Sequence, residues 1–558
     1  MREIPVPTLF PAKVQVQLPP VGSSHATEQA TNTMDIGLAL PFYDHFLKTP
    51  SRVALHVDGV SYSYGELGAI AGRIAALLRD RGNIERVGIL AGRSVEAYAG
   101  ILAAAWAGAT FVPLNPKYPE ERLLSIIRRS RLDAVVLDRS GAGVLTPRVL
   151  NACPALLLAP ALEEETGAGM ALVGRRTIAT QAMSVPPVRA AAEKNAYILF
   201  TSGTTGEPKG VMVTNANVAH FLRVSQERYC LGPEDRLSQQ SELTFDHIVF
   251  DLFMAWGYGA GVYVVPENMV MAPAEFIRQQ GLTVWFAVPS VISFLKEMKL
   301  LRPGIFPSLR LSLFAGEPLP RELADAWQEA APHSRIDNLY GPTEATVDCL
   351  WQPYISPLRI TPGRGVVAIG QPYEGMCAEI VDVAGNFLKS GEVGELAVSG
   401  PQVSAGYLDN PELTARRYPC LKHPELGAST WYLTGDLSYR DADGIFHYLG
   451  RVDNQVKVMG QRLELEDVEF HLRAVCQRDS VAVIGWPVKY GTAQGLVAFV
   501  TGEKPDQRRI KEILRHRLQA YMVPRRIVHL EKMPLNLNGK VDRKALADLL
   551  AAECDPHG

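Results

Sequence analysis

A segment rich in glycine and hydroxyl-bearing residues, TSGTTGEPKG at positions 201–210, has the composition of a loop that binds phosphate. Its glycines permit close approach of the backbone to a ligand, its hydroxyls can donate hydrogen bonds, and Lys209 supplies a cation. The Gly-x-x-x-x-Gly-Lys-Ser/Thr spacing of a Walker motif is absent. We therefore expect a triphosphate-binding loop of another kind, which begins with Thr201, Ser202, Gly203, Thr204, Thr205 and Gly206.

The elements that must position this loop are predicted by the pattern around it. The loop follows an apolar run at 196–200, which predicts a strand. Similar β-rich runs, such as 86–90 and 261–265, alternate with helical stretches as far as about residue 450, and this alternation is typical of stacked α/β layers. We therefore expect one large, multi-layer α/β domain at 34–452.

The two ends of the chain have a different pattern. Residues 1–33 lack periodicity and are expected to be a flexible tail, and a helix is predicted to start near Met34 and to continue through Phe42 and Phe46. After the large domain comes a much shorter unit with predicted strands at 481–485 and 496–500 flanked by helical segments. This unit is predicted to be a small α+β domain at 453–558.

The composition limits the classes of function. The 558 residues are 47% hydrophobic and 21% charged with a formal net charge of -3, so the chain can bury at least two cores but has no overall positive field for nucleic acid. Its seven cysteines include no Cys-x-x-Cys pair, which predicts neither a zinc ribbon nor a disulfide framework and favours a reducing cytoplasm. No apolar run reaches the roughly 18 residues that cross a bilayer, so we expect no membrane partner.

The 201–210 loop resembles the phosphate loop of the adenylate-forming superfamily, which includes acyl-CoA synthetases, luciferases and the adenylation domains of nonribosomal peptide synthetases. Further segments resemble the family's motifs in the family's order, and together they cover the chain from about residue 40 to 546. The resemblance implies that ATP and Mg²⁺ activate a carboxylic acid as an acyl-adenylate with release of pyrophosphate.

Two of these segments resemble the part of the family site that holds adenosine and magnesium. In YGPTEAT at 340–346, the resemblance implies that Tyr340 stacks on adenine, Thr343 contacts the α-phosphate and Glu344 holds Mg²⁺, roles that suit a flat ring and a hard carboxylate oxygen. In YLTGD at 432–436, it implies that Asp436 accepts both ribose hydroxyls. The expected adenine wall also includes Gly316, Glu317, Pro318, Asn338 and Gly341.

The last two segments resemble the family's moving parts. GRVDNQVK at 450–457 places Arg451 on the ribose-phosphate side and Asp453 at the hinge, and PLNLNGKVDR at 534–543 places the catalytic lysine at Lys540. The resemblance implies that Lys540, Lys209, Thr343 and Glu344 serve the first half-reaction. The mobile C-terminal domain then turns about Asp453, withdraws Lys540, and completes a tunnel for a pantetheine thiol with its opposite face near Gly460.

The substrate is expected to be an amino acid. LTFDHIVFD at 243–251 resembles the amino-acid-activating branch, in which the first aspartate, here Asp246, binds the substrate's ammonium group, although the same residue could cap the following helix. The expected side-chain pocket is narrow and mostly apolar, and its residues resemble those of stand-alone enzymes that load proline onto carrier proteins. These residues are Asp246, His247, Phe250, Phe286, Leu313, Ala315, Leu339, Val347 and Asp348.

His247 and Asp348 depart from the proline-type pocket. Asp348 could neutralise a second cation, bind a substrate hydroxyl, accept the shifted ammonium of a β-amino acid, or pair with His247. We therefore expect a small amino acid, cyclic or polar. A separate acyl or peptidyl carrier protein is the expected partner, and the basic face of a predicted helix at 507–518 is a candidate dock or simply a solvated surface. The alternatives are a carboxylic acid–CoA ligase and a nucleotide-binding regulatory protein.

Overall fold

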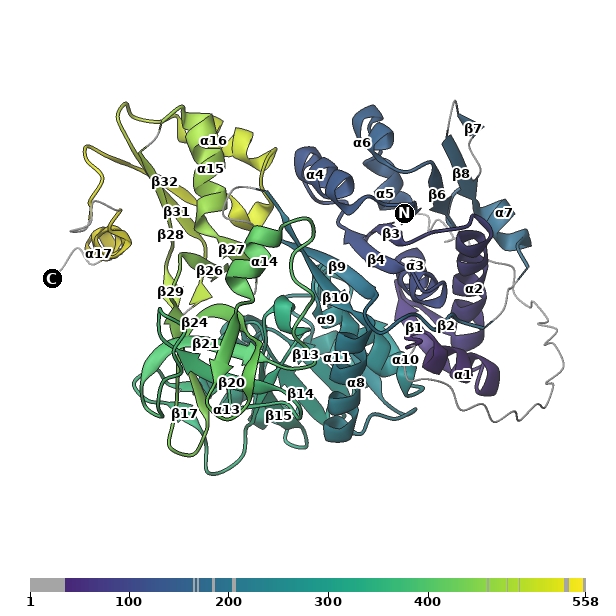
Figure 1. The fold of residues 1–558 in the computed structure, drawn as a ribbon, viewed down its shortest axis with the longest axis horizontal. Coiled ribbons are helices and arrows are strands. Elements are labelled where there is room, and N and C mark those ends of the chain that lie inside the picture. The colour runs from purple at the N-terminus through teal and green to yellow at the C-terminus, as the bar shows by residue number, and fades with distance from the viewer. Residues whose placement is uncertain are drawn as a thin grey trace.

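The computed structural model describes residues 36–163, 166–167, 170–182, 186–202, 207–458, 461–478, 480–490, 492–535 and 541–554. The predicted α/β class is confirmed: a large N-terminal part carries two sheets with parallel centres and antiparallel edges, and a smaller unit follows (Figure 1). The central strands are buried on both faces, which explains their uninterrupted apolar sequences.

The first sheet has eight strands and ends on the hairpin that carries the phosphate loop. In spatial order these are β10 (Lys209–Thr214), β9 (Asn195–Thr201), β4 (Thr110–Leu114), β3 (Arg86–Leu90), β5 (Ala134–Leu137), β6 (Leu156–Ala159), β8 (Met170–Gly174) and β7 (Thr166–Gly167).

The second sheet has nine strands. In spatial order these are β19 (Gln371–Pro372), β16 (Leu350–Pro353), β15 (Arg335–Tyr340), β14 (Leu311–Phe314), β13 (Val284–Ala287), β11 (Arg236–Gln239), β12 (Gly261–Val264), β1 (Val53–Val57) and β2 (Val60–Ser63). The parallel register Phe286↔Leu313↔Asp337 aligns the ends of β13, β14 and β15 at one edge.

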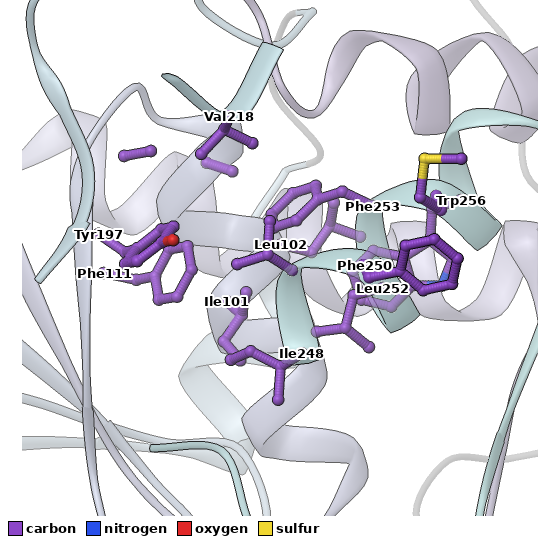
Figure 2. Packing of buried hydrophobic residues seen from close by; sticks show 14 of the residues in the cluster. Ile101, Leu102, Phe111, Tyr197, Val218, Ile248, Phe250, Leu252, Phe253 and Trp256 are labelled. Atoms are coloured by element: carbon purple, nitrogen blue, oxygen red, sulfur yellow. The ribbon is translucent and has the colours of Figure 1, made fainter. Parts of the chain in front are cut away.

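Helices fill the space between and around these sheets. α3 (Val95–Trp106) is buried along its whole length, as expected of a helix that is apolar on all sides. Figure 2 shows Ile101 and Leu102 of this helix in the same core as residues of β4, β9 and the helical segment that begins at α9. The other helices of this part are α1 (Leu40–Lys48), α2 (Tyr64–Asp80), α4 (Glu120–Ser130), α5 (Arg139–Gly143), α6 (Pro147–Ala152), α7 (Arg175–Thr180), α8 (Asn215–Tyr229), α9 (His247–Val249), α10 (Ala255–Gly257), α11 (Ala274–Gln280), α12 (Pro289–Glu297), α13 (Arg321–Ala330) and α14 (Pro411–Arg417), with a π-helical stretch at Phe250–Met254.

An antiparallel sheet connects the large part to the C-terminal unit. Its strands are β20 (Cys377–Val381), β21 (Val393–Ser399), β24 (Tyr432–Arg440) and β25 (Phe446–Arg451), and β17 (Ile360–Thr361), β18 (Val366–Val367), β22 (Cys420–His423) and β23 (Gly427–Thr430) form two small hairpins.

The C-terminal unit, residues 455–554, has its own apolar core. The hairpin of β26 (Gln455–Val458) and β27 (Gln461–Glu464) projects toward the large part, whereas α17 (Arg543–Cys554) lies on the far side of the unit from β9 and β10 (Figure 1). The remaining elements are β28 (Val481–Gly485), β29 (Val488–Lys489), β30 (Thr492–Ala493), β31 (Leu496–Thr501), β32 (Arg526–Leu530), α15 (Leu465–Cys476) and α16 (Gln507–Arg515).

Two predicted helix boundaries were wrong. The helix expected from Met34 begins only at Leu40, because Ile36 is extended in a bridge with Ala190 and Pro41 fits the first helical turn. The helix predicted at 507–518 ends at Arg515, although Leu518 is still buried in the following turn. No helix in the described ranges is both long and apolar enough to cross a membrane.

Candidate active site

A pocket lies between the large part and the C-terminal unit, at the carboxyl ends of parallel strands, where open α/β sheets usually bind ligands. The large part contributes the end of β9, the segment before α9, and the turns after β14 and β15. The C-terminal unit contributes its β26–β27 hairpin. The lining includes Thr201, Ser202, Asp246, His247, Gly316, Tyr340, Gly341, Thr343, Asp436, Arg451, Lys457, Gln461 and Arg462.

The groups expected to hold ribose form a hydrogen-bonded cluster. Arg451 Nη1 donates to Asp436 Oδ1 at 2.8 Å, and the Tyr340 hydroxyl donates to Asp436 Oδ2. Arg451 also makes a two-pronged contact with Asp453, with Nε–Oδ1 at 2.9 Å and Nη2–Oδ2 at 2.7 Å. The expected hinge residue is therefore tied to the expected ribose site through one guanidinium.

An adjoining pocket contains the residues expected to surround adenine, including Gly316, Glu317, Pro318, Asn338 and Tyr340. The Asn338 amide nitrogen donates to the carbonyl of Ala368 at 2.8 Å, which leaves its carbonyl oxygen buried without a hydrogen-bond partner among the described residues. A buried acceptor of this kind is a site for a ligand donor group.

The described start of the phosphate loop contacts the β26–β27 hairpin. The Ser202 hydroxyl donates to the carbonyl of Arg462 at 3.3 Å and accepts from the amide of Glu464 at 3.2 Å, and the Thr201 hydroxyl is buried without a described partner. Gly203, Thr204, Thr205, Gly206 and Lys540 lie outside the described residues, as does Gly460.

Two ion pairs cross from the hairpin to the expected phosphate and magnesium groups. Arg462 Nη1 lies 3.1 Å from Glu344 Oε2, and Glu464 Oε1 lies 3.1 Å from Lys209 Nζ. Glu344 is fully buried and also accepts from the Tyr407 hydroxyl at 2.7 Å. Burial would raise the pKa of Glu344, but the charges of Arg462 and Lys209 hold that pKa at about 2, so the carboxylate stays ionised.

Asp246 lines the same pocket. It occupies the position before α9, but its side chain makes no capping hydrogen bond, so the helix-cap alternative does not describe this residue. Burial raises the pKa of Asp246 to about 6, against the effect of a hydrogen bond from Thr343. A buried carboxylate with few donors favours a cationic ligand.

The expected side-chain pocket residues are all buried, and the structure brings their apolar members into one cluster. The His247 ring stacks on Phe286 at 4.3 Å between centroids, and Phe286 meets Phe250 edge to face at 5.3 Å. Asp246 and His247 line the open pocket and Leu339 lines the adjoining one, whereas the other members of the expected side-chain pocket are buried outside both linings. The members other than Asp246 and His247 are Phe250, Phe286, Leu313, Ala315, Leu339, Val347 and Asp348.

The matches to family models decide the family. The model described as AMP-binding enzyme matches residues 42–408, and the model described as AMP-binding enzyme C-terminal domain matches residues 468–540. The chain belongs to the AMP-binding enzyme family.

Similar proteins place this family member near amino-acid-activating systems. The chain is 34% identical over 473 residues to the L-proline–[L-prolyl-carrier protein] ligase of Pseudomonas fluorescens, covering 84% of this chain and 89% of the relative. It is 32% identical to tyrocidine synthase 3 of Brevibacillus parabrevis, of which it spans only 8%. The crystal structure of the Vibrio cholerae adenylation domain AlmE in complex with glycyl-adenosine-5'-phosphate is 30% identical with a TM-score of 0.81, covering 95% of this chain and all of that one.

Sequence reasoning missed Arg462, Glu464 and Lys457 in this AMP-binding enzyme. The signal was present in QRLE at 461–464, because residues two apart on a strand share a face and therefore Arg462 and Glu464 point the same way. Their partners could not be identified, since Glu344 is 118 positions away from Arg462 in the chain.

Proposed function

We propose that this protein activates an amino acid with ATP to form an aminoacyl-adenylate and pyrophosphate, and then transfers the aminoacyl group to the phosphopantetheine thiol of a separate carrier protein. The observation that carries the proposal is the presence of Asp246 in the same pocket as Tyr340, Thr343 and Asp436. A cation-binding carboxylate therefore lies beside the groups suited to adenylate.

Two kinds of group bind the adenosine end. One has no hydrogen-bond partner among the described residues, and the other can exchange its present partner for the ligand. The free carbonyl oxygen of Asn338 accepts the exocyclic amine of adenine, and Tyr340 provides a flat face for the ring. Asp436 accepts from the ribose hydroxyls while its other oxygen is paired with Arg451.

The reacting groups meet near Thr343. The substrate carboxylate forms a bond to the α-phosphorus as the bond from that phosphorus to pyrophosphate breaks, and Lys209 and Lys540 offset the charge of two anions brought together. The ionised Glu344 is a hard oxygen donor that fits Mg²⁺ when Arg462 is displaced. The metal supplies positive charge next to the phosphates.

The arrangement of the C-terminal unit supports a two-step reaction. The β26–β27 hairpin engages Glu344 and Lys209, while α17, which follows Lys540 in the sequence, lies on the far side of the unit from β9 and β10 (Figure 1). Rotation about Asp453 exchanges these two faces. In the second step the thiol sulfur bonds to the acyl carbon and AMP leaves.

The close packing of the expected side-chain pocket supports a small amino acid, cyclic or polar. His247 stacks on Phe286, and Phe286 meets Phe250 edge to face. The basic residues Arg508 and Arg509 of α16 are exposed and offer a dock for an acidic carrier protein.

The first experiment is amino-acid-dependent pyrophosphate exchange over the proteinogenic set, proline analogues, β-amino acids and diamino acids, with Asp246→Asn and Lys540→Ala. We expect one amino acid or a few related ones to give a strong signal that Asp246→Asn reduces at least about 100-fold. Activity only with acids that lack an amine would refute amino-acid activation and leave a carboxylic acid–CoA ligase. No exchange with any acid would leave a nucleotide-binding regulatory protein.

A further inference from the structure

Asp348, one of the residues expected to surround the substrate side chain, is a buried carboxylate with no hydrogen-bond partner among the described residues. Its exposed fraction is 1%, and both carboxylate oxygens are buried with no hydrogen-bond partner in the described parts of the chain. Buried polar groups in native proteins are nearly always paired, and an unpaired buried carboxylate is especially unfavourable. This side chain therefore needs a partner that the described residues do not supply.

The backbone around Asp348 is held in an unusual conformation. Thr346 and Val347 have φ values of +59° and +68°, which β-branched residues rarely adopt. The buried side-chain amide of Gln402 donates to the carbonyl of Asp348 at 2.7 Å and to those of Ala345 and Thr346 at 3.3 Å. A turn that is strained and clamped in this way indicates that the position of Asp348 matters.

The same turn lies directly against the proposed adenylate site. A Cβ built on Gly341, which lines the open pocket, would lie only 2.5 Å from the Cα of Asp348. Val347, the preceding residue, belongs to the apolar cluster with Phe250, Phe286 and Leu339. The backbone at Asp348 therefore lies against the wall of the open pocket, next to the apolar cluster expected to surround the substrate side chain.

No described neighbour donates a hydrogen bond to the Asp348 carboxylate. The pair with His247 is absent, since neither oxygen of Asp348 has a described hydrogen-bond partner and His247 instead stacks on Phe286. The charges that act most on Asp348 are the like charge of Asp246 and the cation of Lys457, which belongs to the C-terminal unit. The Tyr373 hydroxyl is also buried without a described partner, and the Tyr373 amide donates to the carbonyl of Cys349 at 2.8 Å.

We infer that Asp348 binds a second ammonium group at the end of the substrate side chain, so that the preferred substrate is a short diamino acid. This inference rests on the proposed amino-acid activation. Asp246 balances the α-ammonium, and a second ammonium balances Asp348, which leaves no net charge in the pair of buried contacts. The apolar walls contact the intervening methylene groups, and the ring of His247 limits their number.

The arrival of an ammonium also changes the protonation of the pocket. Burial, and then the charge of Asp246, raise the pKa of Asp348 well above its usual range, which favours the protonated form of this carboxyl. An ammonium group favours the ionised form, and binding therefore releases a proton to the buffer. A neutral hydroxyl on the substrate gives no such release.

The test compares matched substrates in pyrophosphate exchange with the full chain: 2,4-diaminobutyrate against 2-aminobutyrate, and 2,3-diaminopropionate against alanine and serine. We expect the diamino member to have at least about 100-fold higher kcat/KM in one of these sets. Asp348→Asn, which conserves shape, should remove that preference, because kcat/KM for the diamino acid should fall much more than kcat/KM for the uncharged substrate of the same set. Calorimetry in buffers of different ionisation enthalpy should show proton release on diamino acid binding, and this release should disappear in Asp348→Asn.

The outcomes separate the inference from the proposed function. Preference for the uncharged partner, for serine or for a β-amino acid without a second amine would overturn the inference and leave amino-acid activation intact. An equal loss of activity with the diamino acid and with its uncharged counterpart in Asp348→Asn would also overturn the inference, because that result indicates a structural role. Absence of exchange with every amino acid would instead remove the proposed function.

Discussion

Arg462→Gln should separate the two half-reactions of this enzyme. Arg462 joins the C-terminal unit to Glu344 through a contact of 3.1 Å, and Glu344 has no exposed surface. Breaking a buried pair on one side typically costs about 3–5 kcal/mol, because the remaining charge is left uncompensated. The Arg462 side chain is 21% exposed, and Lys209 and Tyr407 remain near Glu344, so we expect about 2–3 kcal/mol.

The loss of the Arg462–Glu344 pair destabilises only the arrangement in which the β26–β27 hairpin contacts the active site. A change of about 2–3 kcal/mol lowers the population of that arrangement by about 30- to 150-fold. Acyl transfer from the preformed adenylate to free pantetheine, followed under single-turnover conditions, should slow by a similar factor. Pyrophosphate exchange should change less than about threefold, because Glu344 then serves the metal without competition from Arg462.

The matched control is Arg526→Gln, which breaks an exposed ion pair with Glu553 inside the C-terminal unit. Exposed pairs contribute about 0–1 kcal/mol, so this variant should retain both half-reactions. The reciprocal change Glu464→Gln, which breaks the pair with Lys209, should reproduce the selective loss of transfer. If Arg462→Gln leaves transfer unchanged, or slows both half-reactions equally, the electrostatic coupling of the hairpin to this arrangement is refuted.

Two further predictions concern the amino-acid side of the site. Burial raises the pKa of Asp246 to about 6, so kcat/KM for the amino acid should be level above pH 6 and should fall about tenfold per pH unit below it. The pH profile of Asp246→Asn should lack this fall at low pH. An unchanged fall in that variant would assign it to another group. Gln402→Ala removes the amide that donates to three backbone carbonyls, and it should lower the free energy of unfolding by about 2–3 kcal/mol in urea titrations. The control Gln507→Ala, at the exposed start of α16, should change this free energy by less than about 0.5 kcal/mol. Similar values for both variants would contradict the role of Gln402 in holding the turn.

Much of the fold was predictable because local patterns specify it. The apolar runs at 86–90 and 196–200 are buried strands, since strands covered on both faces have uninterrupted apolar sequences. The start of α1 was not predicted, because the apolar residues near Met34 also suit an extended segment and only the bridge of Ile36 with Ala190 selects that conformation. The local sequence pattern gives no information about a partner that lies so far away in the chain.

The candidate site was likewise predictable only in part. The types and order of Asp246, Tyr340, Glu344 and Asp436 follow from contiguous motifs, so the sequence by itself determined the family and the class of chemistry to be expected. Only the tertiary structure decided that Arg462 faces Glu344 and that the Asp348 carboxylate is buried without a hydrogen-bond partner among the described residues, because pairing and desolvation depend on which distant segments pack around a group.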